Sequence, residues 1–162
     1  MMVEQRRSEL LSLAYLLTGD ADVSVAAVAE MRGGGGFFDN WMEAWARRVA
    51  VSKALSGVHS QLAASIARTR QAARRQPAAG AFPAASRGVD PGVTEAQLRD
   101  ALFALDLFPR CALVLAVYER MPFADVAVLL GVEEKFLAIV LAASARELSR
   151  NLAVGQGGAA AA

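Results

Sequence analysis

The sequence predicts an all-α protein made of two small helical domains joined by a linker. Alanine and leucine dominate the composition, and β-branched residues never alternate with polar ones over a sustained run, so helices are favoured over strands. Apolar residues instead recur three and four positions apart, the spacing of helices that bury one face. With 162 residues, the chain is long enough to bury a core in one domain or in two small ones.

The first part of the chain predicts a bundle of three helices. The first covers residues 3–17 and ends at a Thr-Gly-Asp turn. Asp22 or Ser24 is expected to cap the second, which the glycines at 33–36 interrupt. The third covers residues 40–56 after an aspartate N-cap, and its broad apolar stripe is expected to contain Trp41, Trp45, Val49 and Leu55.

A change in composition divides the chain into domains. The helical pattern continues to residue 76, and then Pro, Gly, Ala and Ser replace it without periodicity, which is typical of a linker. We therefore predict an N-terminal domain over 1–76, a linker over 77–92, a C-terminal domain over 93–152 and a loose low-complexity tail over 153–162.

The C-terminal domain ends in a helix-turn-helix pattern. Thr94 and Gln97 predict a capping box for a helix reaching about residue 107, and Pro109 is expected to begin the next helix. Residues 123–150 then predict a helix, a tight turn at Gly131 and a longer helix. The residues expected on the inward side of this unit are Val126, Ala127, Leu130, Val132, Leu137 and Val140.

Positive charge is concentrated near residue 76, where the helical pattern that follows the third expected helix ends. Residues 61–90 contain five arginines and one aspartate, whereas residues 91–162 contain six basic and eight acidic residues, a net charge of 6 − 8 = −2. A negative domain is unfavourable for duplex DNA, because non-specific affinity comes from neutralised phosphates. The clustered arginines form either a solvated helix end or a contact with phosphates or an acidic partner; they are Arg68, Arg70, Arg74 and Arg75.

Several classes of function are disfavoured. The chain has one cysteine, Cys111, so an intramolecular disulfide is excluded and a buried inert thiol is expected. It has one histidine, His59, so a metal cluster is not expected, and the histidine should lie at the surface or at a helix end. No catalytic constellation or phosphate-binding loop is found, so we expect neither an enzyme nor a cofactor. The longest apolar run, 136–145, is shorter than the roughly 20 residues that span a bilayer. With no secretory signal, a cytoplasmic protein without a membrane partner is expected.

The order of these parts resembles the extracytoplasmic-function (ECF) group of RNA polymerase sigma factors. The similarity covers roughly residues 8–58 and 95–152. Three C-terminal motifs contribute to the resemblance. LDLFPRCALVL at 105–115 resembles the family's helix with leucine-proline and arginine, and FADVAVLLGV at 123–132 resembles its first helix and turn. AREL at 145–148 resembles its closing arginine-leucine segment. Its N-terminal motifs resemble the start of the polymerase-binding domain and the promoter-melting helix: AYLLTGD at 14–20 and FDNWMEAWAR at 38–47.

This resemblance implies that the chain binds the RNA polymerase core and promoter DNA. It implies a polymerase contact for Glu30 and a strand-separation role for Trp41 and Trp45, since bases stack on indoles. A core stripe is the alternative interpretation of the two tryptophans. The cations available for DNA contact are those of the last helix and of the arginine cluster: Lys135, Arg146, Arg150, Arg68, Arg70, Arg74 and Arg75.

The expected reading helix departs from the family pattern. A helix that reads DNA presents polar side chains to phosphates and base edges, yet Phe136, Ala138, Val140 and Ala143 stand where the family has threonine, lysine and two arginines. We therefore expect an ECF-like sigma factor protein in transcription initiation or its regulation, with a degenerate DNA-reading helix. The alternative is a protein-interaction module without DNA binding, which docks a partner or a second copy through Phe136, Ile139, Val140 and Ala143.

Overall fold

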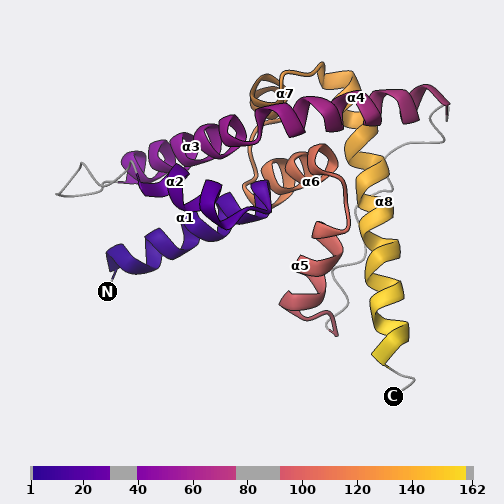
Figure 1. Cartoon of the computed structure of the whole chain (residues 1–162), viewed down its shortest axis with the longest axis horizontal. Coiled ribbons are helices and arrows are strands. Elements are labelled where there is room, and N and C mark those ends of the chain that lie inside the picture. Colours follow the sequence, from indigo (N-terminus) through magenta and orange to yellow (C-terminus); the bar gives the residue numbers. More distant parts are fainter. Residues whose placement is uncertain (1, 30–39, 76–91, 160–162) are drawn as a thin grey trace. The chain divides into compact units, whose positions relative to one another are not determined.

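The computed structural model describes residues 2–29, 40–75 and 92–159, except for the side chains at 2–4, 40–43 and 155–159. Every regular element in these ranges is a helix, which confirms the all-α prediction. The chain forms two compact units, unit 1 (Met1–Ala63) and unit 2 (Ala64–Ala162), and each is coloured along the sequence in Figure 1. The expected linker lies almost entirely outside the described residues.

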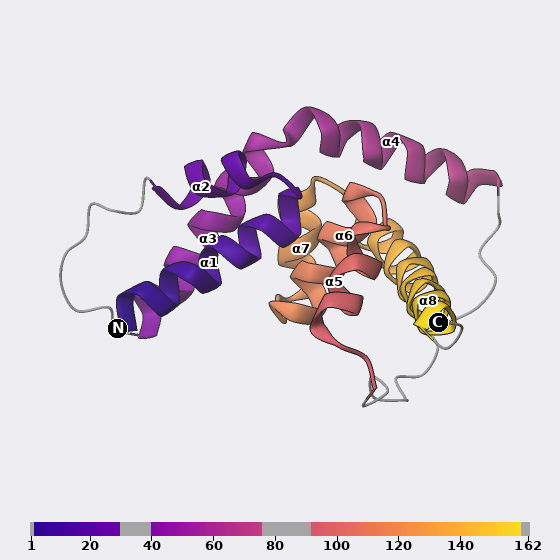
Figure 2. The same cartoon turned by 60° about the horizontal axis from the view of Figure 1, so that its bottom comes forward.

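Unit 1 is a bundle of three helices, α1 (Met2–Thr18), α2 (Ala21–Ala29) and α3 (Asn40–Gly57), and each packs against the other two. Figures 1 and 2 show them side by side in both views. Leucine and valine fill the space between the helices, and small alanines allow close approach. The most deeply buried residues include Leu13, Ala14, Leu17, Ala50, Val51 and Ala54.

Asp20 is the N-cap of α2, because its carboxylate accepts hydrogen bonds from the backbone N–H groups of Asp22 (2.8 Å) and Val23 (3.0 Å). The sequence-based choice of Asp22 or Ser24 was therefore wrong. An N-cap precedes the helical residues whose N–H groups it satisfies, and both alternatives already lie inside the helix. Ser24 is instead buried, with its hydroxyl 3.0 Å from the Thr18 hydroxyl.

Glycine at the end of α3 allows a close approach to α2. A Cβ atom built at Gly57 would lie 2.5 Å from Cγ1 of Val23, which is closer than carbon atoms pack. Val23 is β-branched and stiff at its first side-chain torsion, so it cannot easily move away. Gly57 therefore contributes space between the two helices.

Unit 2 contains the rest of the helices. Helix α4 (His59–Arg75) begins in unit 1, and its residues from Ala64 onward belong to unit 2. The unit continues with α5 (Glu95–Phe103), α6 (Leu107–Leu113), a π-helical turn η2 (Val114–Tyr118), α7 (Phe123–Leu130) and α8 (Glu134–Ala159). Helices α5, α6 and α7 all pack against α8. The largest fully buried side chains here are Phe108, Cys111, Leu115, Val126 and Leu137.

The capping box of α5 is confirmed. Thr94 Oγ1 accepts a hydrogen bond from the Gln97 N–H (3.2 Å), and the Thr94 N–H donates to Gln97 Oε1 (2.9 Å). However, α5 ends at Phe103 rather than near residue 107, because Asp106 caps α6 by accepting from the Leu107 N–H (2.9 Å). Helix α6 thus begins two residues before the expected proline, in a first turn where a missing N–H is tolerated.

The segment from α7 to α8 turns at Gly131, which has a left-handed backbone (φ 65°, ψ 38°) and ends α7. Only glycine adopts this conformation without strain. The inward residues Val126, Ala127 and Leu130 are buried as expected. Helix α8 continues to Ala159, beyond the expected domain end at residue 152; this last segment contains no proline, although it includes three glycines, which disfavour helix.

In the ranges that the structure describes, no helix combines the length and the apolar character needed to cross a membrane.

Candidate functional site

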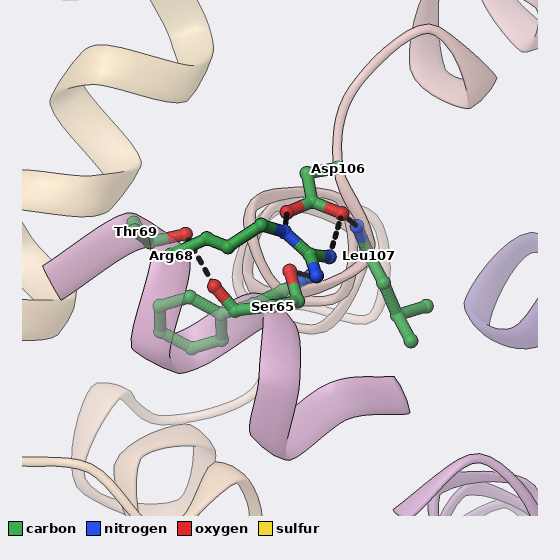
Figure 3. Close-up of polar contacts among 6 residues, drawn as sticks. Ser65, Arg68, Thr69, Asp106 and Leu107 are labelled. Carbon is green, nitrogen blue, oxygen red and sulfur yellow. Dashed lines mark hydrogen bonds and ion pairs between the residues drawn. The ribbon is translucent and has the colours of Figure 1, made fainter. Parts of the chain in front are cut away.

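The buried side chain of Ser65, on α4, forms a hydrogen bond with the start of α6. Ser65 Oγ accepts a hydrogen bond of 2.9 Å from the backbone N–H of Phe108, and the Thr69 hydroxyl donates to the Ser65 carbonyl (2.9 Å) (Figure 3). The first N–H groups of a helix have no partner within the helix. Here Asp106 satisfies the first of them and Ser65, from another helix, satisfies the second. The start of α6 is therefore complete only when α4 is in place.

An ion pair lies beside this serine. The Arg68 guanidinium donates two hydrogen bonds to the Asp106 carboxylate, from Nη2 to Oδ1 (2.8 Å) and from Nε to Oδ2 (3.0 Å), as Figure 3 shows. This bidentate arrangement is the strongest geometry for such a pair. Hydrogen bonding by Arg68 lowers the pKa of the Asp106 carboxyl below its usual value. Both side chains are largely exposed, so solvent screens the attraction.

Two aromatic rings and a guanidinium form a second contact between α4 and the rest of unit 2. The rings of Phe108 and Phe136 stack at a centroid distance of 5.7 Å and an angle of 15°. The Arg70 guanidinium carbon lies 5.3 Å from the centroid of the Phe136 ring, within cation–π range. Phe136 is therefore half-buried among α4, α6 and α8, and the start of α8 is partly covered by α4.

The four clustered arginines divide into two pairs. All four are exposed; Arg68 and Arg70 contact Asp106 and Phe136, and Arg74 and Arg75 stand at the end of α4. All four belong to unit 2. The C-terminal half defined from the sequence did not include them and had a negative net charge. The described residues of unit 2 carry 4 + 6 = 10 basic and 8 acidic side chains, a net charge of 10 − 8 = +2.

We expect Asp106→Asn to make the stability of unit 2 less dependent on acid. The folded-state pKa of Asp106 is lowered, so its contribution is fully present above the unfolded-state pKa and is lost as the pH falls through the folded-state value. The difference in urea midpoint between parent and variant should be constant above about pH 5 and should shrink below about pH 4. Asparagine still caps α6, so the change isolates the charge. Asp100→Asn, at an exposed position of α5, is the matched control; a constant gap down to pH 2 would contradict the prediction.

The exposed face of α8 carries cations and small apolar residues. Lys135, Ile139, Ala143, Arg146 and Arg150 are all exposed, and their spacings of four, four, three and four residues place them on one side of the helix. Val140 was expected both among the inward residues and on the apolar interaction face; it is only 2% exposed, so it belongs to the core and not to that face. A position one residue from Ile139 lies about 100° around the helix, so the two cannot share a face.

Trp45 lies on the surface of unit 1, contrary to the expectation of a core stripe. Its side chain is 57% exposed. The buried stripe of α3 consists of Ala46, Ala50, Val51, Ala54 and Leu55, and Trp45 lies on the opposite side together with the exposed Arg48 and Ser52. The recurrence of alanine every four residues was the signal for a close-packed inner face. The side chain of Trp41 and the whole of Glu30 lie outside the described residues.

The remaining candidate side chains are structural. Cys111 is fully buried, as expected, and burial raises the pKa of its thiol to about 12, which disfavours the reactive thiolate. His59 is exposed at the first position of α4, also as expected. Sequence reasoning missed the packing of Arg110, a buried side chain whose guanidinium carbon lies 4.8 Å from the Phe103 ring centroid. Within the described ranges, no three histidine, cysteine or acidic side chains could together hold a metal ion.

Comparison with known proteins finds no family model, no curated protein and no solved structure that matches this chain. A functional hypothesis therefore depends on the chain's own side chains and their geometry.

Proposed function

We propose that this chain is a degenerate ECF-type sigma factor protein that acts in transcription initiation or its regulation, and that it contacts unpaired promoter DNA through α3. The order of parts supports this proposal. A three-helix unit precedes a unit in which α7, the left-handed turn at Gly131 and α8 follow one another as in a helix-turn-helix. The partners are then the RNA polymerase core and promoter DNA.

Helix α8 is a poor reader of duplex DNA. Glu133 and Glu134 are exposed at its start, where they repel phosphates, and Phe136 is occupied by its contacts with Phe108 and Arg70. The exposed Ile139 and the small residues near it offer no hydrogen bonds to base edges. These features favour a role for unit 2 other than sequence-specific reading.

The exposed indole of Trp45 is the observation that carries the proposal. Exposing a large aromatic side chain forgoes hydrophobic stabilisation, and the Trp45 indole has a flat face on which an unpaired base can stack. Arg48 follows it three residues later on the same side of α3. A cation that attracts phosphates and an indole on which bases stack are the two components of single-strand recognition, and stacking contributes about 1–3 kcal/mol per base.

The proposal is tested by fluorescence titration with DNA. In a Trp41→Phe background, Trp45 is the single remaining indole of the chain. A duplex with a central unpaired bubble should quench its emission, and the fully paired duplex should quench it much less. Trp45→Ala should weaken bubble binding, measured by anisotropy of labelled DNA, by about 5- to 150-fold, the equivalent of 1–3 kcal/mol.

Tyr118→Ala is the matched control, because Tyr118 is a similarly exposed aromatic residue of unit 2. It should bind the bubble as the parent does. Equal affinities of Trp45→Ala and the parent for the bubble, or equal losses in the two variants, would refute the assignment to α3. Co-elution of the chain with RNA polymerase core on size exclusion tests the partner, and separate elution at micromolar concentrations would contradict a sigma-like role.

A further inference from the structure

The second half of α4, residues 64–75, packs on unit 2 with little apolar contact, and we call it the α4 strap. Ser65 is its single buried residue, and only Ile66, Thr69 and Ala73 are half-buried. Spacings of one, three and four residues place these four on one narrow side of the helix. Hydrophobic stabilisation scales with the apolar area that is buried, so the docking of the strap contributes little compared with the core of unit 2.

The core of unit 2 is built from the helices that follow the strap. Helices α5, α6 and α7 pack against α8, and the buried apolar side chains of these helices and of η2 include Leu115, Val126, Leu137, Val140 and Leu141. The α4 strap supplies no buried apolar side chain to this core. We therefore expect the helices from α5 to α8 to stay packed when the strap is released.

Two polar contacts connect the α4 strap to the start of α6 (Figure 3). The bidentate ion pair between Arg68 and Asp106 is largely exposed, so water and salt compete with it. The hydrogen bond from the Phe108 N–H to Ser65 Oγ is buried, but water replaces the hydroxyl once the strap has moved away. Neither contact therefore requires the rest of the unit to unfold when it breaks.

The α4 strap also covers an aromatic ring at the start of α8. The Arg70 guanidinium carbon lies 5.3 Å from the centroid of the Phe136 ring, which stacks on Phe108. Arg70 is exposed, and a cation–π contact at an exposed site is weak. Release of the strap therefore uncovers the side of Phe136 that faces Arg70.

We propose that the α4 strap opens as one cooperative unit while the helices from α5 to α8 stay folded, and that this opening controls access to Phe136. Segments with few buried apolar contacts open at lower free energies than the whole domain does. A released segment of twelve residues is marginal as an isolated helix in water, so it loses its helical hydrogen bonds when it opens. This device goes beyond the proposed contact between α3 and DNA, and it does not depend on that contact.

Native-state hydrogen exchange of the full chain, followed by NMR at urea concentrations below the unfolding transition, tests the proposal. The amide of Thr69 reports on the strap, and the amide of Phe108 reports on the contact of the strap with α6. We expect these two amides to share one free energy of opening and one urea dependence, both smaller than those of the Leu141 amide in the core. Equal values at all three amides would overturn the proposal, because the strap would then open only with the whole unit.

Variants at the exposed contacts identify what keeps the strap closed. Arg68→Gln and Arg70→Gln leave the buried hydrogen bond to α6 in place. Each should lower the protection factors of the Thr69 and Phe108 amides by the same factor, about two- to fivefold. Arg74→Gln, the same change at an exposed position of the strap, should leave both protection factors unchanged. Unequal effects on the two amides, or an effect of Arg74→Gln as large as that of Arg68→Gln, would contradict the proposal.

A core variant separates opening of the strap from unfolding of the whole unit. Val126→Ala, at a fully buried position of α7, should lower the protection factor of the Leu141 amide by at least about tenfold, because it destabilises the core. The protection factors of Thr69 and Phe108 should not change, because the core stays folded when the strap opens. Equal losses at all three amides would refute a separate opening of the strap.

Discussion

Phe108→Ala should lower the free energy of unfolding of unit 2 by about 3–5 kcal/mol, the usual cost of removing a fully buried aromatic ring. Phe108 is 0% exposed, and its ring stacks on Phe136. Loss of the ring leaves a cavity at the point where α4, α6 and α8 meet, and it also removes support from the ring beneath Arg70. The loosened docking of α4 should add to the direct cost of the cavity.

Urea unfolding followed by circular dichroism, together with hydrogen exchange of α6 and α8 amides, measures this effect. Both tryptophans lie in α3, so their fluorescence reports on unit 1 and serves as an internal reference. Val128→Ala is the matched control, because Val128 is 80% exposed and its loss should change stability by less than about 0.5 kcal/mol. Similar unfolding midpoints for Phe108→Ala and Val128→Ala would contradict the prediction that the Phe108 ring stabilises the core of unit 2.

Ser65→Ala should destabilise unit 2 by about 1–3 kcal/mol, although it removes a single oxygen atom. The hydroxyl of Ser65 is the acceptor for the Phe108 N–H, and both groups are buried. Deleting the acceptor leaves a buried donor without a partner, which costs more than the net value of the bond. The expected signature is faster exchange of the Phe108 amide relative to the amides in the middle of α8.

Ser56→Ala is the control for this substitution. Its hydroxyl likewise bonds to a backbone group, donating to the Ser52 carbonyl (2.9 Å), but it is exposed, so water can replace the bond. A change of less than about 0.5 kcal/mol is expected there. Similar exchange rates at Phe108 in the Ser65→Ala variant and in the parent would show that α4 does not cap α6 in solution.

Features that depend on neighbours in the sequence were predicted well. The Thr94 and Gln97 capping box, the turn at Gly131 and the burial of Cys111 are all observed. Each follows from spacing along a single helix or from the backbone preference of one residue, so no knowledge of other helices is needed. The start of α6 was predicted at Pro109, but the helix begins two residues earlier, at Leu107, because Asp106 caps it.

Features that depend on contacts between helices were not predicted. On α3, Leu55 of the expected apolar stripe is buried, but Trp45 is exposed, because the alanines that form the inner face were overlooked. The arginines of α4 were interpreted as a solvated end or as a contact with phosphates or an acidic partner; all four are exposed, but the bond of Arg68 to Asp106, thirty-eight residues away along the chain, was not foreseen. The spacing of residues within α4 does not reveal a contact with a residue at the start of another helix.

The sequence by itself therefore determined which segments form helices and some of the caps and turns that bound them, because hydrogen bonds and caps within a helix join residues at most a few positions apart. Only the tertiary structure decided which side of each helix is covered and which charges are already engaged, because those outcomes depend on distant residues. Trp45 became a surface residue for this reason, and Ser65 became the cap of a helix that begins forty-two residues later.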